Sequence, residues 1–206
     1  MLNETELKLR LNSEGELRRV LLWCEKNLGP PSQSQQRDEY YDTPAEDLRK
    51  QDLSLRVRRV DGIVMIAMKS PRVFLTANIH DRIELEFTAA DVNEVTSTIA
   101  RYGLRATAVT EKRRWRFQQD DFKVLIDVLP FIGYFAEIEA PTVERINEVV
   151  IMLGLSTNQG VNRNYSELLE EKLTEIGLPV RPSLRATFED EAEWKATHNS
   201  PAQNKH

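Results

Sequence analysis

Charged and apolar residues alternate in the first stretch of the chain, Glu4-Thr5-Glu6-Leu7-Lys8-Leu9-Arg10-Leu11. A period of two is typical of a β-strand whose faces differ, so the two carboxylates and the two cations share one face. Paired carboxylates can hold a hard cation such as Mg²⁺ or Mn²⁺, and neighbouring cations can hold the phosphates that such a metal bridges. Taken alone, the stretch also fits a half-buried strand with a solvated charged face.

The same alternation returns along the chain, with carboxylates and cations segregated by strand. It is found in Arg56-x-Arg58, Arg82-x-Glu84-x-Glu86, Lys112-x-Arg114 and Glu137-x-Glu139, and Lys69 and Asp127 stand at the ends of further strands. Two architectures fit this pattern. An open antiparallel sheet would show its charged face to water, whereas a closed barrel would place the charges inside, where they must be paired, metal-bound or ligand-bound.

Helices are predicted where apolar residues recur at helical spacing between capping and stop signals. Ser13 and Glu16 have capping-box spacing before a helix that Gly29-Pro30 ends. Further helices are expected over 88–103, with Thr88 as the cap, from about Thr142 to Gly154, and from about Asn164 to Ile176. Cys24 falls on the apolar face of the first helix and reads as a core residue.

The remaining segments are read as strands and loops. Strands are expected over 4–11, 37–42, 53–58, 63–69, 82–87, 112–117, 123–128 and 133–139, with a hairpin turn at Asp61-Gly62. Residues 32–36 are read as a polar loop and 70–81 as a long loop. Residues 1–180 then form the folded domain, and the polar segment 185–206 is expected to be a disordered tail.

Composition narrows the classes of function. The 206 residues carry a net charge of −5, which does not suggest a nucleic-acid-binding protein. A single cysteine rules out an internal disulfide framework, and no signal peptide or run of about 20 apolar residues is visible. We expect a cytoplasmic protein that binds no membrane and is a monomer or a homodimer.

In order, these blocks resemble the CYTH superfamily, also called triphosphate tunnel metalloenzymes. Glu4-Thr5-Glu6-Leu7-Lys8 resembles the E-x-E-x-K signature, and the other matching blocks are Asp38-x-Tyr40-Tyr41-Asp42-Thr43-Pro44, Leu55 to Arg58, Lys69-Ser70-Pro71, the later charged pairs, and Asn164 to Leu169. The resemblance covers about residues 2–175 and is specific as an ordered set. It implies an α+β fold: a closed antiparallel eight-stranded tunnel β-barrel with a charged interior and helices packed on the outside.

The resemblance also implies roles for site residues. The phosphates of a triphosphate would be held by Lys8, Arg56, Arg58, Lys69, Arg82, Lys112 and Arg114. Metal would be held by Glu4, Glu6, Glu137 and Glu139, with Glu84, Glu86 and Asp127 as candidates for a second ion or for ordering the cations. Tyr40 and Lys69 match positions that assist departure of the leaving group in some hydrolytic members, and would be the catalytic pair.

The leading hypothesis from the sequence is a hydrolase of inorganic triphosphate, ATP or another organic triphosphate that depends on Mg²⁺ or Mn²⁺. A class IV adenylate cyclase, which forms cyclic AMP and diphosphate from ATP, is the alternative enzyme. One departure counts against it, because Pro130-Phe131-Ile132-Gly133 stands where a Gly-Leu-Gly-like turn is expected. A non-catalytic module that binds nucleotide or polyphosphate is a further alternative, although it would need the cations and not the carboxylates.

Overall fold

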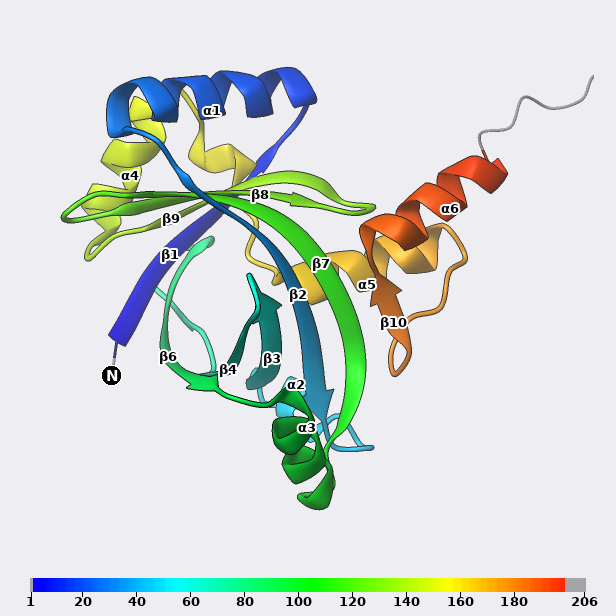
Figure 1. Cartoon of the computed structure of the whole chain (residues 1–206). Coiled ribbons are helices and arrows are strands. Elements are labelled where there is room, and N and C mark those ends of the chain that lie inside the picture. The colour runs from blue at the N-terminus through cyan, green and yellow to red at the C-terminus, as the bar shows by residue number, and fades with distance from the viewer. Residues whose placement is uncertain (1, 199–206) are drawn as a thin grey trace, which may run out of the picture.

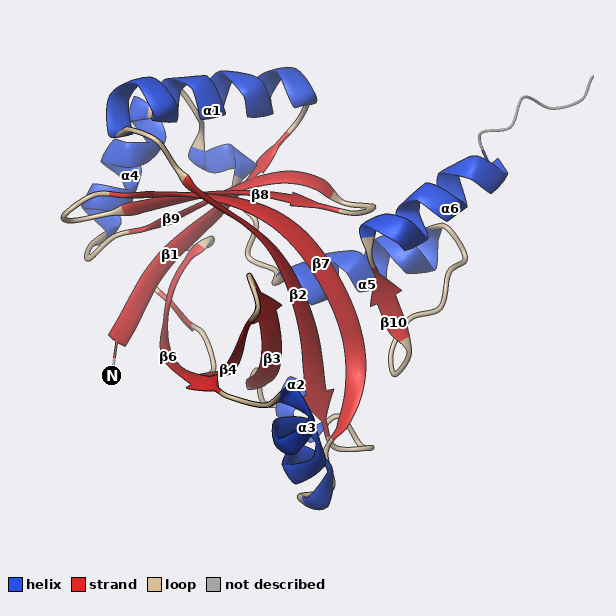
Figure 2. Ribbon diagram, viewed as in Figure 1, coloured by secondary structure: helices blue, strands red, loops and turns tan. Residues whose placement is uncertain are grey.

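The computed structural model describes residues 2–198, and its side chains from Thr5 to His198. Eight antiparallel strands form a closed barrel, with helices on its outside (Figures 1 and 2). Around the barrel the strands are β1 (Leu2–Leu11), β9 (Gly133–Glu139), β8 (Lys123–Leu129), β7 (Arg105–Gln118), β2 (Ser32–Asp42), β3 (Ser54–Val60), β4 (Ile63–Lys69) and β6 (Ile79–Ala89). The closed barrel predicted from the sequence is confirmed, and the open sheet is wrong.

The barrel closes through its first strand. β1 pairs with β9 over Glu6–Leu11 and with β6 over Leu2–Leu7, so both of its edges are hydrogen-bonded. Two short strands lie outside the closed ring of eight. β5 (Val73–Phe74) pairs with β6, and β10 (Leu184–Ala186) runs parallel to β7.

Helices cover the apolar outer face of the barrel in three places. α1 (Glu14–Leu28) and α4 (Val143–Met152) lie on the side of β1, β8 and β9, where Val20, Cys24 and Ile146 are fully buried (Figure 1). α3 (Val92–Arg101) packs on β2 and β3, and α5 (Tyr165–Glu175) packs near β10. A 3₁₀ turn, η1 (Thr157–Gln159), leads towards α5, and α2 (Asp47–Lys50) joins β2 to β3. Within the described chain, no helix is long and apolar enough to cross a bilayer.

The cap signals locate most helix starts. Ser13 caps α1 by accepting from the Glu16 N–H, Thr142 caps α4, and Asn164 caps α5 in a reciprocal capping box with Glu167. The predicted start of α3 is wrong, because Thr88 lies inside β6 and Asp91 is the cap. The buried position expected for Cys24 is confirmed.

Three other expectations differ from the structure. Residues 32–36 are the first half of β2 and not a loop. A strand of this barrel can be polar on both faces, because one face borders the charged cavity and the other borders water. The long loop expected over 70–81 contains β5 and the start of β6. The segment expected to be a disordered tail forms β10 and α6 (Phe188–His198), anchored by the buried side chains of Leu184 and Ala186; residues 199–206 lie outside the described chain.

Candidate active site

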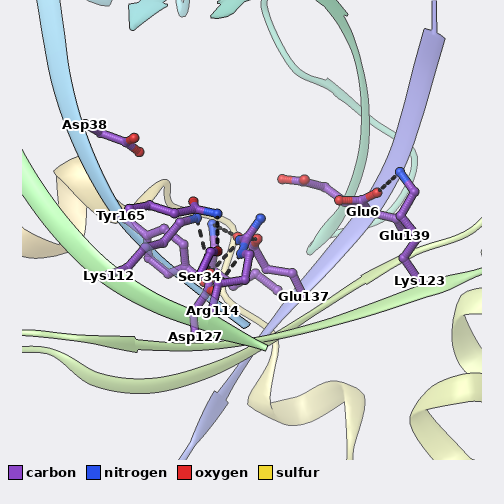
Figure 3. Close-up of polar contacts among 12 residues, drawn as sticks. Glu6, Ser34, Asp38, Lys112, Arg114, Lys123, Asp127, Glu137, Glu139 and Tyr165 are labelled. Atoms are coloured by element: carbon purple, nitrogen blue, oxygen red, sulfur yellow. Dashed lines mark hydrogen bonds and ion pairs between the residues drawn. The ribbon is translucent and has the colours of Figure 1, made fainter. Parts of the chain in front are cut away.

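A cavity of about 360 Å³ occupies the interior of the barrel. Because alternate residues of a strand face the same side, the charged-x-charged pairs from Arg56 onward point to this interior, as does Glu6. Figure 3 shows side chains from β1, β2, β7, β8 and β9, with Tyr165 at the start of α5, around this space. The volume is within the usual range for small-molecule sites.

All seven predicted phosphate-binding cations line the cavity. They come from five strands: Lys8 from β1, Arg56 and Arg58 from β3, Lys69 from β4, Arg82 from β6, and Lys112 and Arg114 from β7. Tyr40, from β2, also lines it. The barrel therefore gathers positive charges that are distant in sequence into one enclosed volume.

A buried carboxylate on β2 fixes two of these cations. Asp38 is 3% exposed and accepts two hydrogen bonds from Arg58, from Nε at 2.7 Å and from Nη2 at 2.8 Å. Its Oδ2 also lies 3.5 Å from Nη1 of Arg56. Burial opposes ionisation of this carboxyl, but the charges of Arg56 and Arg58 outweigh burial and hold the pKa of Asp38 well below its usual range. Asp38 thus holds the two guanidinium groups in place.

Asp127, on β8, has the same function for two cations of the neighbouring strand β7. Its side chain is fully buried, accepts from Arg114 Nε at 2.7 Å and Nη2 at 2.5 Å, and lies 3.4 Å from Nζ of Lys112 (Figure 3). The Tyr165 hydroxyl donates to it at 3.0 Å. Asp127 does not line the cavity. Of the two roles that the sequence left open for Asp127, its position supports the ordering of cations.

Lys112 has an altered proton affinity. Burial and the positive charges of Arg114 and Arg58 lower the pKa of its ammonium group to about 7, although Asp127 and Glu137 act in the opposite direction. The lysine is 6% exposed. Additional negative charge in the cavity would therefore raise the pKa of Lys112, so that the lysine takes up a proton near neutral pH.

The predicted metal-binding carboxylates are also gathered, with two exceptions. Glu6, Glu84, Glu86, Glu137 and Glu139 line the cavity. Asp127 lies behind the wall. The Glu4 side chain lies outside the described residues, although the backbone of Glu4, in β1, pairs with that of Arg82 in β6.

Each described carboxylate contacts a basic side chain. Glu137 lies 3.4 Å from Lys8 Nζ and also accepts from Arg114, Glu139 lies 2.6 Å from Lys123 Nζ, and Glu6 Oε1 lies 3.1 Å from His80 Nε2. On β6, Glu84 lies 2.8 Å from Lys69 Nζ, and Glu86 lies 3.6 Å from Arg56. The cavity is thus a network of paired charges.

The donor set fits a hard divalent cation in its chemistry. Glu6 and Glu139 are register partners on β1 and β9, and both present oxygen ligands to the cavity. Burial opposes ionisation of Glu6, but the contact with His80 and the charges of Lys69 and Lys8 lower the pKa of its carboxyl to about 2. Between Thr5 and His198, no three acidic, histidine or cysteine groups are gathered closely enough to form a metal cluster as they stand. Binding of a metal ion would therefore separate these carboxylates from the basic side chains they contact.

Sequence reasoning assigned no site role to Asp38, His80 or Tyr165. Asp38 alternates with Tyr40 and Asp42, so its inward direction was readable from the strand period. His80 precedes the Arg82-x-Glu84 pair by two residues, and the same period places it on the inner side. Nothing in the sequence around Tyr165 indicated a site role beyond its helical spacing, because its position at the cavity depends on how α5 packs against the barrel.

Comparison with known proteins is consistent with this geometry. Residues 2–165 match the model of the CYTH domain family. The chain belongs to the CYTH family. It is 30% identical over 152 residues to adenylate cyclase CyaB of Aeromonas hydrophila, an alignment that covers 68% of this chain and 75% of that protein. CYTH enzymes act on small triphosphates, as adenylate cyclases or as triphosphatases, so membership gives the class of substrate and leaves the reaction open.

Solved CYTH-like structures have the same barrel. The PH1012 protein of Pyrococcus horikoshii is 26% identical to this chain, with a TM-score of 0.65 over 80% of this chain and 98% of its own. The PH1819 protein of the same organism is 24% identical, with a TM-score of 0.68 over 82% of this chain and 99% of its own. These two similarities show that the chain has the same fold as those proteins.

Proposed function

We propose that this chain is a divalent-metal-dependent hydrolase of triphosphates. The observation that supports the proposal is that the seven predicted phosphate-binding cations and five of the predicted metal-binding carboxylates line one cavity inside the barrel. Cations alone would suffice to bind a polyanion, whereas ionised carboxylates facing the same volume add repulsion unless they hold a metal. Hydrolysis is also the less demanding reaction for this site, because it needs a held triphosphate and an activated water and no positioned ribose oxygen.

In this proposal the cations bind and orient the phosphates. Arg56, Arg58 and Arg114 present guanidinium groups that are fixed from behind by Asp38 and Asp127, so little reorganisation is needed on binding. Glu4, Glu6, Glu137 and Glu139 would hold Mg²⁺ or Mn²⁺, with Glu84 and Glu86 on β6, the strand next to β1. When bound, such a cation supplies neutralisation of phosphate charge and activation of water.

Water attack forms a new P–O bond at the terminal phosphorus and breaks the bond to the bridging oxygen. The products from inorganic triphosphate are orthophosphate and diphosphate. Negative charge develops on the bridging oxygen, and Lys69 and Tyr40, both in the cavity wall, would stabilise it.

An adenylate cyclase is the second candidate, because the Aeromonas relative bears that name. The sequence departure that counted against it has no bearing on the cavity. Pro130-Phe131-Ile132-Gly133 forms the turn between β8 and β9, where the Phe131 N–H donates to Glu191 of α6 and the Ile132 carbonyl accepts from Arg10. None of its four residues lines the cavity.

Product analysis distinguishes the candidates. The protein is incubated with inorganic triphosphate, ATP or thiamine triphosphate, each with Mg²⁺ or Mn²⁺, and the products are separated by chromatography. We expect orthophosphate without cyclic AMP. Cyclic AMP with diphosphate would establish the cyclase, and binding without turnover of any substrate would establish a non-catalytic module.

A metal-ligand variant provides the matched test. Glu6→Gln removes one cavity carboxylate and should lower turnover by about 100-fold, whereas Glu25→Gln, the same change on the exposed surface of α1, should leave it unchanged. Full turnover by a folded Glu6→Gln protein would contradict the metal assignment.

A further inference from the structure

A buried amide in the cavity wall has an unused hydrogen-bond acceptor. Gln36 lies on β2 and is 7% exposed, and its side chain lines the cavity. Its Nε2 donates to Ser34 Oγ at 3.0 Å. Its Oε1 has no hydrogen-bond partner among the described residues. A buried acceptor without a partner costs free energy, so it stays only where something compensates.

The surroundings of Gln36 include apolar as well as charged side chains. Its register partner is Val60 of β3. Two residues before Val60, Arg58 also faces the cavity, and its register partner is Met65 of β4. Both Val60 and Met65 line the cavity. On its other side Gln36 is paired with Lys112 of β7. The amide therefore lies at the border between the cationic wall and an apolar patch of Val60 and Met65.

Phosphate does not match this border. A fully ionised triphosphate offers only acceptor oxygens, which an amide oxygen repels, and it gains nothing from Val60 or Met65. A group with an N–H or O–H donor and an apolar face would satisfy Oε1 and cover the apolar patch. A nucleoside attached to the triphosphate has both properties, since its base is flat and its amino and hydroxyl groups are donors.

We propose that Gln36, Val60 and Met65 bind the nucleoside part of a nucleoside triphosphate, with Gln36 Oε1 accepting from its N–H or O–H group. This inference rests on the proposed function, in that the phosphates occupy the cationic wall. The proposed hydrogen bond makes Gln36 a specificity residue, because nucleoside triphosphates can form it and inorganic triphosphate cannot.

The test compares two substrates and two variants. Gln36→Met keeps the length of the side chain and removes the acceptor, and Gln35→Met makes the same change at the exposed neighbour on the outer face. Gln36→Met should lower kcat/KM for ATP consumption by about tenfold and leave kcat/KM for inorganic triphosphate within about twofold. Gln35→Met should change neither. An equal loss on both substrates, or no loss on ATP, would overturn the proposal.

Substrate analogues test the wild-type protein without a variant, and separate the two sources of the donor. Purine riboside triphosphate lacks the amino group of ATP, and 2′-deoxy-ATP lacks one ribose hydroxyl. A loss of about tenfold in kcat/KM with the first assigns the donor to the base, and with the second to the ribose. 3′-Deoxy-ATP tests the other ribose hydroxyl in the same way, and unchanged kcat/KM with all three analogues would overturn the proposal.

Binding separates this inference from the proposed function. If no triphosphate is turned over, hydrolysis is refuted, and calorimetric titration with ATP and with inorganic triphosphate still tests Gln36. The inference then requires Gln36→Met to raise the Kd for ATP by about tenfold and leave the Kd for inorganic triphosphate unchanged. Equal Kd changes for the two ligands would refute it.

Discussion

Lys112 lies among like charges at the centre of the binding wall. A pKa of about 7 predicts that the neutral amine form of Lys112 gains population between pH 7 and pH 8 when the cavity holds no polyanion. The folded-state pKa lies below the ordinary lysine value, so the charged form costs stability at acidic pH, and this cost is relieved as the pH rises from about 7 towards about 10.5.

Binding of a triphosphate at pH 8 should therefore take up close to one proton, because negative charge raises the pKa of Lys112. Calorimetric titrations in two buffers of different ionisation enthalpy measure this uptake. Lys112→Met should abolish most of it, and Lys26→Met, on the exposed face of α1, should not. Equal binding enthalpies in both buffers would show that Lys112 is already protonated.

The residues that carry charge at alternate positions were predictable, because strand period and charge type together specify an inward ionised face. Gln36 and Tyr165 were not predictable, since a glutamine in a polar stretch and a tyrosine in a helix have many ordinary places. Their positions follow from register between strands and from the docking of α5, which a single sequence does not encode in a local pattern.

The added strand β10 is held by its side chains. Leu184 is 1% exposed and belongs to the same apolar cluster as Leu169 and Leu173 of α5, while β10 pairs with residues 108–110 of β7. The C-terminal segment as far as β10 is therefore part of the folded body.

Leu184→Ala should lower the free energy of unfolding by about 3 kcal/mol, because it removes buried methyl groups and leaves a cavity. Leu22→Ala, at a leucine of α1 that is 66% exposed, should change it by less than about 0.5 kcal/mol. Denaturant titration measures both. A small effect at Leu184 would mean that β10 contributes little to the stability of the barrel.

At the scale of elements, prediction worked where one face was apolar and failed where neither face was. The strands at 63–69, 123–129 and 133–139 lie within a residue of expectation. Residues 32–36 were read as a loop because Ser34 and Gln36 face a polar cavity while Gln33 and Gln35 face solvent. The polar tail was misread for a related reason, since only Leu184 and Ala186 of the short β10 contribute to the core.

Across the whole molecule, the cavity gathers charges of both signs. The seven predicted phosphate-binding cations line about 360 Å³. Asp38, Asp127 and glutamates of the cavity wall form ion pairs with them, such as Arg58 with Asp38 and Lys8 with Glu137. A bound triphosphate with its metal would replace the contacts that the cations make with the cavity carboxylates.

Addition of inorganic triphosphate with Mg²⁺ at about 100 times its Kd should raise the free energy of unfolding by about 2.7 kcal/mol, which corresponds to roughly 5–10 °C in Tm for a chain of this size. Orthophosphate at matched ionic strength is the control and should give a smaller shift. A Tm that does not respond to triphosphate would contradict binding inside the barrel.

The closure of the barrel through β1 also sets an order of events during synthesis. β1 leaves the ribosome before the other strands of the barrel, but its partners are β6 and, last, β9, which ends at Glu139. At translation rates of about 5–20 residues per second, the leucines on the outer face of β1 wait roughly ten seconds before the barrel can close. Among the elements made early, α1 packs against β1 in the finished fold. The first helix is thus placed to shield Leu7, Leu9 and Leu11 in the nascent chain until the last strand arrives.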